Sequence, residues 1–209
     1  MIVRFSILFL ALLVFSCTEQ SVKTNKLLLP IIGEKKLAGV NGTDTIYHTV
    51  QPFSFINQFN DSVTGKTIAN KIYVADFFFA TCQSICPKMS SQLVHVQDAF
   101  KNDKDVLILS HTVNPLHDTV EVLNGYSQSY GAIKNKWHFL TGNKKEIYDM
   151  ARYSYLVNAL EEDGSAEGFL HSELFILVDK QKRIRGFYDG TDSVAVVKLI
   201  SDIKLLKQE

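Results

Sequence analysis

The sequence predicts a single α/β domain, in which helices cover both faces of a central sheet. Three observations predict it: a nearly continuous apolar run at 71–80, an alternation of strand-like and helix-like segments after it, and a closing strand pair followed by a helix. The 209 residues are 46% hydrophobic and include 14 Phe and 8 Tyr, enough for one well-filled core. Lysine plus arginine and aspartate plus glutamate both number 22, so the charge balance gives no support for a nucleic-acid partner.

The amino terminus has the features of a signal peptide. Arg4 supplies a positive charge, and residues 5–15 form an apolar run that is too short to span a bilayer, which needs about 20 apolar residues. Cys17 then follows a small residue, as in the lipobox of bacterial lipoproteins, although Phe15 stands where a smaller residue is usual. We therefore expect cleavage before Cys17 and a diacylglycerol anchor on its thiol. The alternative is an ordinary signal peptide or an uncleaved anchor, with Cys17 incidental.

Three regions are expected along the chain. They are a lipoprotein signal peptide at 1–16, a lipid-anchored tether at 17–35 and a folded domain at 36–209. In either reading of the leader, the domain is exported to a compartment where exposed thiols tend to oxidise, and the lipoprotein reading places it on a membrane, facing the periplasm.

Two hairpins are expected ahead of the main sheet. Asn41-Gly42 is a turn signal between strand-like runs within 36–50. Runs at 52–56 and 66–68 flank further turn residues and predict a second hairpin.

The main elements follow in alternation. The run at 71–80 is rich in β-branched and aromatic residues, as in a strand buried on both faces. After it, continuous apolar runs, which predict strands, alternate with segments whose apolar residues have helical spacing. Strands are expected at 71–80, 105–113, 137–140, 173–179 and 183–188, and helices at 89–100, 118–130, 145–155 and 194–206. This is the element order of the thioredoxin fold, with the hairpin at 36–50 as an addition.

The chemistry of the chain is expected at Cys82 and Cys86. They lie between a buried strand and a helix, at the edge of the sheet where α/β folds commonly place reactive groups. The partial positive charge of a helix N-terminus favours thiolate, which is the form that binds metals or attacks disulfides. If both cysteines lay in regular helix, their Cβ atoms would be about 5–6 Å apart. A disulfide needs about 3.5–4.5 Å between them, so it would require some local distortion, whereas a bridging metal tolerates the longer gap. The alternative is a disulfide that only stabilises the fold.

Two thiolates leave a metal site incomplete, and a third donor is needed. Soft sulfur ligands select copper(I) or zinc. His171 is the candidate, because it ends a polar, Gly-containing loop and precedes a predicted strand at the junction that faces the redox cysteines in a thioredoxin fold. Thioredoxins place a cis-proline there, and this chain has no proline after Pro115. The remaining histidines are expected at the surface or in structural roles: His48, His95, His111, His117 and His138.

Four segments together resemble the SCO/SenC family of copper-binding proteins, over about 52–206. They are ADFFFATCQSICPKM, NPLHDTVEVLNGYSQSYG, WHFLTGNKKEIYDMA and HSELFILVDKQKRIRGFYDG. The resemblance implies a thioredoxin-like fold with copper(I) or copper(II) held by Cys82, Cys86 and His171. It also implies delivery of copper to the copper-site subunit of a haem–copper respiratory oxidase, with a copper donor or a thiol reductant protein as a further partner. Asn114 departs from the family, where many members carry aspartate.

We interpret the chain as a metallochaperone and not as an enzyme. The alternative is a thiol–disulfide oxidoreductase that reduces cysteines of a partner protein, with Cys82 and Cys86 as its redox-active pair. A peroxidase and a purely structural lipoprotein are weaker readings. Met89 is expected to pack in the core, Asp76 to be a buried hydrogen-bond hub or to tune the thiols, and Lys134, Lys136, Lys144 and Lys145 to be solvated.

Overall fold

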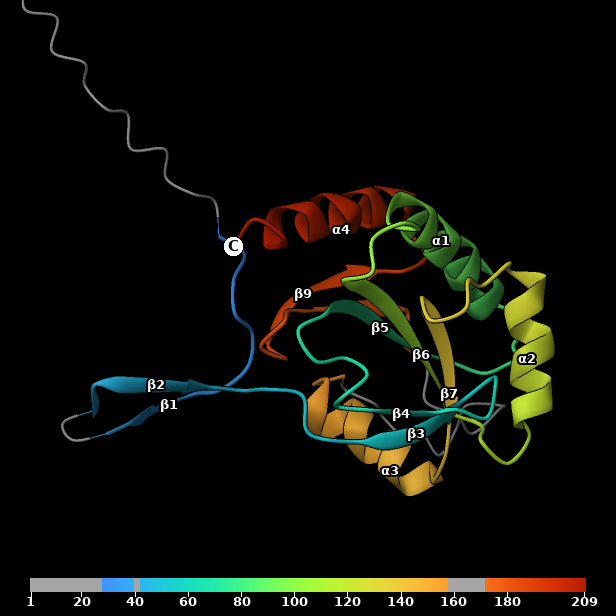
Figure 1. Ribbon diagram of the computed structural model, residues 1–209, viewed down its shortest axis with the longest axis horizontal. Helices are drawn as coiled ribbons and strands as arrows, with labels where there is room; N and C mark the ends of the chain where they lie inside the picture. Colours follow the sequence, from blue (N-terminus) through green and yellow to red (C-terminus); the bar gives the residue numbers. More distant parts are fainter. Residues whose placement is uncertain (1–27, 40–41, 158–171) are drawn as a thin grey trace, which may run out of the picture.

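The computed structural model describes residues 28–39, 42–157 and 172–209. The strands of its main sheet are β3 (Ser54–Asn57), β4 (Ser62–Thr64), β5 (Ile72–Phe78), β6 (Val106–Thr112), β7 (Trp137–Thr141), β8 (Leu174–Val178) and β9 (Ile184–Asp189). They lie in the order β4-β3-β7-β6-β5-β8-β9 (Figure 1). β5, β6 and β7 run parallel, whereas β8 and β9 are antiparallel to their neighbours. Every residue of β5 is buried, as the apolar run at 71–80 predicts, and so is every residue of β6.

Helices lie on both faces of this sheet, which confirms the predicted α/β class. They are α1 (Ile85–Ala99), α2 (Val120–Ser129), α3 (Lys144–Asp149) and α4 (Ser193–Leu206), and a π-helical turn at Met150–Ser154 continues α3. Figure 1 shows α1 and α4 together on one face, α3 on the other and α2 beside β7.

Three of the helices begin at a residue that caps the first turn. The side chains of Thr119, Asn143 and Asp192 each accept a hydrogen bond from a backbone N–H of the helix that follows. Such caps satisfy donors that have no partner within the helix. α1 differs, because Ser84 at its N-cap position makes no side-chain cap.

The first predicted hairpin is present as a separate two-stranded sheet. β1 (Lys35–Ala38) and β2 (Asp44–Tyr47) pair antiparallel, and Figure 1 shows them projecting away from the body of the molecule. This confirms the additional N-terminal hairpin.

The second predicted hairpin is present, but its second strand was placed wrongly at 66–68. β4 begins at Ser62, because the turn closes early on the side chain of Asn57. Its Oδ1 accepts hydrogen bonds from the backbone N–H groups of Phe59 and Asp61, both at 2.9 Å. The residues expected to form the strand instead form turns after Thr64.

Residues 29–32, which the sequence analysis assigned to the tether, contact β9 and, at Leu29, the end of the chain. Arg185 on β9 donates hydrogen bonds to the carbonyl oxygens of Leu29 (2.6 Å) and Pro30 (2.9 Å) and to the carboxylate of Glu209 (2.6 Å). Glu209 in turn accepts from the backbone N–H of Leu29 at 2.9 Å. This Arg185 clamp fixes where the N-terminal segment joins the body.

The described part of the chain contains no helix that is both long and apolar enough to cross a membrane.

Candidate metal-binding site

A short loop between β5 and α1 carries both cysteines of the candidate site. Cys82 lies in this loop, and Cys86 is the second residue of α1. Both are free thiols, and they are only 5% and 3% exposed. Because only one of the two is helical, the distance expected for a pair within regular helix does not apply to them.

Ser84 contributes to this site in place of capping its helix. Its hydroxyl lies 3.4 Å from the sulfur of Cys82. Ser84 therefore caps no N–H group at the start of α1, and the Cys82 sulfur instead receives the backbone N–H of Cys86, in the first turn of the helix.

The two thiols have opposite acidities. Burial raises the pKa of Cys82, but hydrogen bonds from Ser84 and from the backbone and thiol of Cys86 outweigh it, so its pKa lies below the ordinary value. Burial raises the pKa of Cys86 far above the ordinary value, and the neighbouring Cys82 and Asp76 add to the shift. The two shifts run in opposite directions, so Cys82 is the thiol that ionises first.

Asp76 on β5 is buried close to this pair. Its carboxylate accepts a hydrogen bond from the Ser110 hydroxyl at 2.5 Å, and that hydroxyl accepts one from the Trp137 indole at 2.8 Å. Burial raises the pKa of Asp76 to about 7, against a smaller lowering by Ser110. Asp76 is therefore both the hydrogen-bond hub and an influence on the thiols, the two roles that the sequence analysis left open.

Asp118 also holds the cysteine loop, and the sequence analysis did not single it out. Its carboxylate accepts hydrogen bonds from the backbone N–H of Ala80 (3.0 Å) and from the hydroxyl of Thr112 (2.5 Å). The residue is completely buried, although it lies just before α2. An aspartate just before a helix would be expected to cap it. Here Thr119 caps α2, and the carboxylate of Asp118 binds the cysteine loop instead.

The start of β8 reaches the same end of the sheet as the cysteines. β8 runs antiparallel to β5, with Ala75 opposite Ile176, so moving back along β8 leads towards the end of β5. Ser172 and Ile85 line one hollow of about 570 Å³, together with apolar side chains of β8, β9 and the segment after α3. Ile85 is the residue before Cys86, so the chain at Ser172 lies beside the cysteine loop.

Two predicted site residues, His171 and Cys17, lie outside the described residues. Among those that are described, no group of three His, Cys, Asp or Glu side chains could hold a metal ion. Two of the other histidines have the positions that we expected: His95 is exposed, and His48 contacts the carbonyl oxygen of Ser154. His111 is not the satisfied structural histidine that we expected, because it is fully buried and its ring nitrogens have no hydrogen-bond partner among the described residues.

Two further expectations have different outcomes. Met89 lies in the hydrophobic core at 1% exposure, which confirms the packing role. The expectation that Lys136 is solvated was wrong, because its ammonium group donates to the backbone carbonyl oxygens of Asp103 and Val106 and the residue is only 5% exposed.

Comparison with known proteins identifies the group to which this arrangement belongs. The SCO1/SenC family model matches residues 41–206. The chain belongs to the SCO1/SenC family. A SCO1/SenC family lipoprotein from Bacillus anthracis str. Ames superimposes with a TM-score of 0.69 at 27% identity, over 77% of this chain and 95% of that one.

Two other solved structures are similar to the chain. BsSco, a member of the Sco family of cytochrome c oxidase assembly proteins in which a disulfide switch was identified, matches with a TM-score of 0.66 and 29% identity over 76% of this chain and 93% of that one. Arabidopsis thaliana ScoI with copper bound matches with a TM-score of 0.62 and 27% identity over 77% of this chain and 99% of that one. These likenesses confirm the thioredoxin-like fold of this SCO1/SenC protein.

Proposed function

We propose that this SCO1/SenC protein carries copper for the assembly of the copper centre of a haem–copper respiratory oxidase. Cys82, Cys86 and His171 hold the ion. The observation that carries the proposal is the pair of buried, free thiols beside Ser172, the residue that directly follows His171. Copper-bound ScoI of Arabidopsis thaliana and the assembly role of the Sco family to which BsSco belongs support it.

The donor set fits copper. Two thiolates are soft ligands of the kind that select copper(I), and an imidazole suits copper(II) as well. Because a metal displaces the thiol protons, binding releases them, and the raised pKa of Cys86 makes its proton the harder one to remove. Three protein ligands leave room for a thiolate of the receiving subunit, so the ion can pass between proteins without being released to water.

Redox state controls this capacity. Oxidation of Cys82 and Cys86 to a disulfide removes two electrons and two protons and leaves no thiolate for the metal. Copper loading therefore requires the reduced pair, and a thiol reductant protein is the partner that would reduce the disulfide.

The test is the copper stoichiometry and affinity of the reduced protein. We expect Cys82→Ser, Cys86→Ser and His171→Ala each to weaken copper binding strongly. His95→Ala, at an exposed position on α1, and Cys17→Ser serve as matched controls and should bind as the wild type does. If His171→Ala keeps the affinity and the spectrum of the wild type, the three-ligand site is wrong.

A thiol–disulfide oxidoreductase is the second candidate, and the opposed acidities of the cysteines favour it. Cys82, with the lowered pKa, would attack a partner disulfide, and Cys86 would then displace the partner thiol, closing a Cys82–Cys86 disulfide as the partner is reduced by two electrons. Insulin reduction at thioredoxin-like rates together with weak copper binding would favour this function over copper carriage.

We also propose that the mature protein begins at a lipidated Cys17 and faces the periplasm. The Bacillus anthracis relative is a lipoprotein, which supports the same processing here. Intact mass of the membrane fraction should show loss of residues 1–16 and addition of a diacylglycerol, and Cys17→Ser should abolish both.

A further inference from the structure

A surface rich in lysine lies where α1 and α4 end. Two adjoining hollows of about 890 and 600 Å³ share residues of the loop after α1. Among the residues that the structure describes, seven lysines and two aspartates line them, and no glutamate or arginine does. We call this the basic surface; its lysines are Lys71, Lys101, Lys104, Lys134, Lys136, Lys204 and Lys207. Because the whole chain has a formal net charge of zero, these lysines are concentrated here and do not reflect a generally basic protein.

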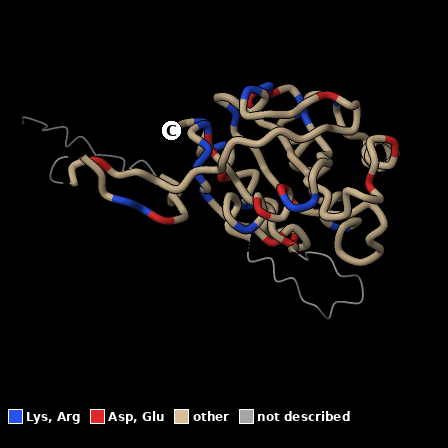
Figure 2. The backbone as a smooth tube through the Cα atoms, turned by 90° about the horizontal axis from the view of Figure 1, so that it is seen from below, with Lys and Arg blue, Asp and Glu red and all other residues tan. Residues whose placement is uncertain are grey.

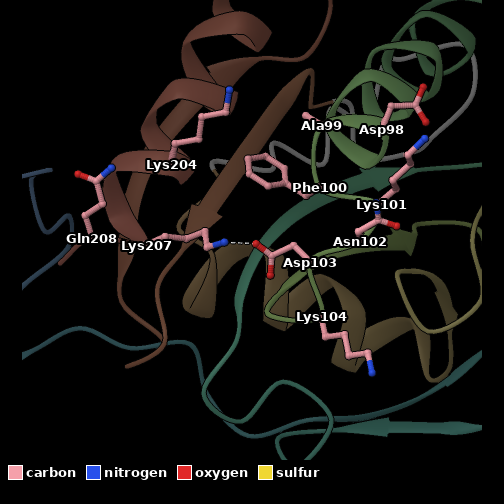
Figure 3. Close-up of a pocket in the computed structure, with 10 residues that line it drawn as sticks. All are labelled: Asp98, Ala99, Phe100, Lys101, Asn102, Asp103, Lys104, Lys204, Lys207 and Gln208. Carbon is pink, nitrogen blue, oxygen red and sulfur yellow. Dashed lines mark hydrogen bonds and ion pairs between the residues drawn. The ribbon is translucent and has the colours of Figure 1, made fainter.

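Some of these lysines have structural partners and others face outward. Lys207 pairs with Asp103 across the larger hollow (Figure 3), Lys71 pairs with Asp105 at 2.9 Å, and Lys136 is buried. Lys101, Lys104 and Lys204 are exposed, and Figure 3 shows their side chains extending outward around the hollow. Lys204 lies in the last turn of α4, where the helix dipole stabilises a cation. Lys101 and Lys104 lie in the loop after α1, where no such helix position explains them.

The N-terminal segment joins the body at this same end. Lys207 is two residues from Glu209, whose carboxylate binds the backbone N–H of Leu29. Figure 2 shows Lys and Arg segments beside the C terminus and the N-terminal segment passing close to them. From Cys17 to Leu28 the chain can span at most about 40 Å, so a lipid on Cys17 keeps Leu28 within that distance of the membrane, and the basic surface decides which face of the domain turns towards it.

We propose that the basic surface lies against the anionic headgroups of the membrane that holds the lipid anchor. The inference rests on the proposed lipidation of Cys17, and it adds a second, electrostatic contact to that anchor. Separated lysine ammonium groups suit a broad anionic plane, because each acts as a point charge and needs no fixed geometry. A diacylglycerol carries two acyl chains and holds the protein by itself, so the basic surface adds orientation to an anchor that is already stable.

This contact sets the direction in which the copper site faces. The basic surface flanks the start of β5, whereas the cysteines follow its end, and the seven-residue strand between them spans about 20 Å. With the basic surface on the lipid, Cys82 and Cys86 face away from it towards a partner in the aqueous phase.

The test is amine footprinting of the full lipidated protein in vesicles of phosphatidylcholine, or of phosphatidylcholine and phosphatidylglycerol at 3:1. A water-soluble acylating reagent and mass spectrometry report each lysine. We expect the labelling rates of Lys101, Lys104 and Lys204 to fall about fivefold or more in the anionic vesicles and to recover in 0.5 M NaCl. Lys88, exposed near the cysteines, should label equally in both.

A charge-matched pair of variants completes the test. Lys101→Gln/Lys104→Gln/Lys204→Gln should abolish the protection of Lys134, and a control with the same charge change, Lys66→Gln/Lys88→Gln/Lys145→Gln, should retain it. Equal labelling of the basic surface in the two vesicle types overturns the proposal. Protection in native membranes but not in anionic vesicles also overturns it, in favour of an acidic protein partner. Copper stoichiometry of the same samples reports separately on the proposed function.

Discussion

The imidazole of His111 makes the stability of this domain sensitive to acid. The ring is fully buried on β6, stacked on Phe77 with a centroid distance of 5.2 Å, and within the described part of the chain neither of its nitrogens has a hydrogen-bond partner. Burial alone lowers the pKa of His111 to about 3. In the unfolded chain the pKa returns to about 6.5, so the unfolded state binds the proton that the folded state excludes.

The size of the effect follows from these two pKa values. Stability is lost as the pH falls below about 6.5, and the loss continues until the folded state is itself protonated near pH 3. The contribution of His111 is about 2 kcal/mol at pH 5 and about 5 kcal/mol at the acid limit.

The perturbation is His111→Phe, which keeps an aromatic ring on Phe77 and removes the titrating group. Urea unfolding of the reduced, metal-free protein at pH 7 and pH 5 gives the free energy of unfolding of each form. The wild type should lose about 2 kcal/mol more than the variant over this range. The same change at the exposed His95 should leave the pH dependence unaltered. Parallel curves for wild type and His111→Phe would refute the reasoning.

Three further predictions concern other buried charges. Because the pKa of Asp76 is raised to about 7 in the folded protein, the wild type loses about 2 kcal/mol of stability from this group as the pH rises from 5 to 7. Asp76→Asn should abolish that loss, which urea unfolding of the reduced protein measures. Arg185→Ala should lower the free energy of unfolding by about 3 kcal/mol, because its buried bonds to Asp179 and Glu209 are lost. Asp118→Ala should weaken copper affinity about tenfold by releasing the cysteine loop, as titration of the reduced protein would show.

Each of these has a control and an opposing outcome. A pH dependence of Asp76→Asn equal to that of the wild type would mean that the carboxyl ionises normally. Arg183→Ala, at a side chain that is 24% exposed, should cost less than about 1 kcal/mol; an equal cost for both arginines would argue against the clamp. Unchanged copper affinity in Asp118→Ala would show that the loop holds its geometry without that carboxylate.

The sequence was sufficient for the elements with strong apolar patterns. β5 and β6 are buried on both faces, and their runs of β-branched and aromatic residues predicted them to within two residues. The second strand of the second hairpin was misplaced because Asn57 closes the turn through its side chain, and such local hydrogen bonds leave little trace in a hydrophobic pattern. The position of the cysteine pair followed from the strand and helix around it.

Residues that act through tertiary contacts escaped prediction. Asp118 and Lys136 are polar residues at loop positions, where solvation is the ordinary expectation. Each is buried because a distant segment supplies its partners: the cysteine loop for Asp118, and the backbone of Asp103 and Val106 for Lys136. Only the folded arrangement of the chain brings those partners within reach.

The Arg185 clamp also decides how mechanical force enters the domain. Tension along the N-terminal segment reaches the body at Leu29 and Pro30 and passes through Arg185 and Glu209 into β9 and the end of the chain. The β-bridge between Ile32 and Ile184 resists part of this tension, because its backbone hydrogen bond holds the chain two residues after Pro30. The cysteine loop follows the opposite end of β5, outside this path, so drag on the domain can strain its attachment without distorting the pair of sulfurs.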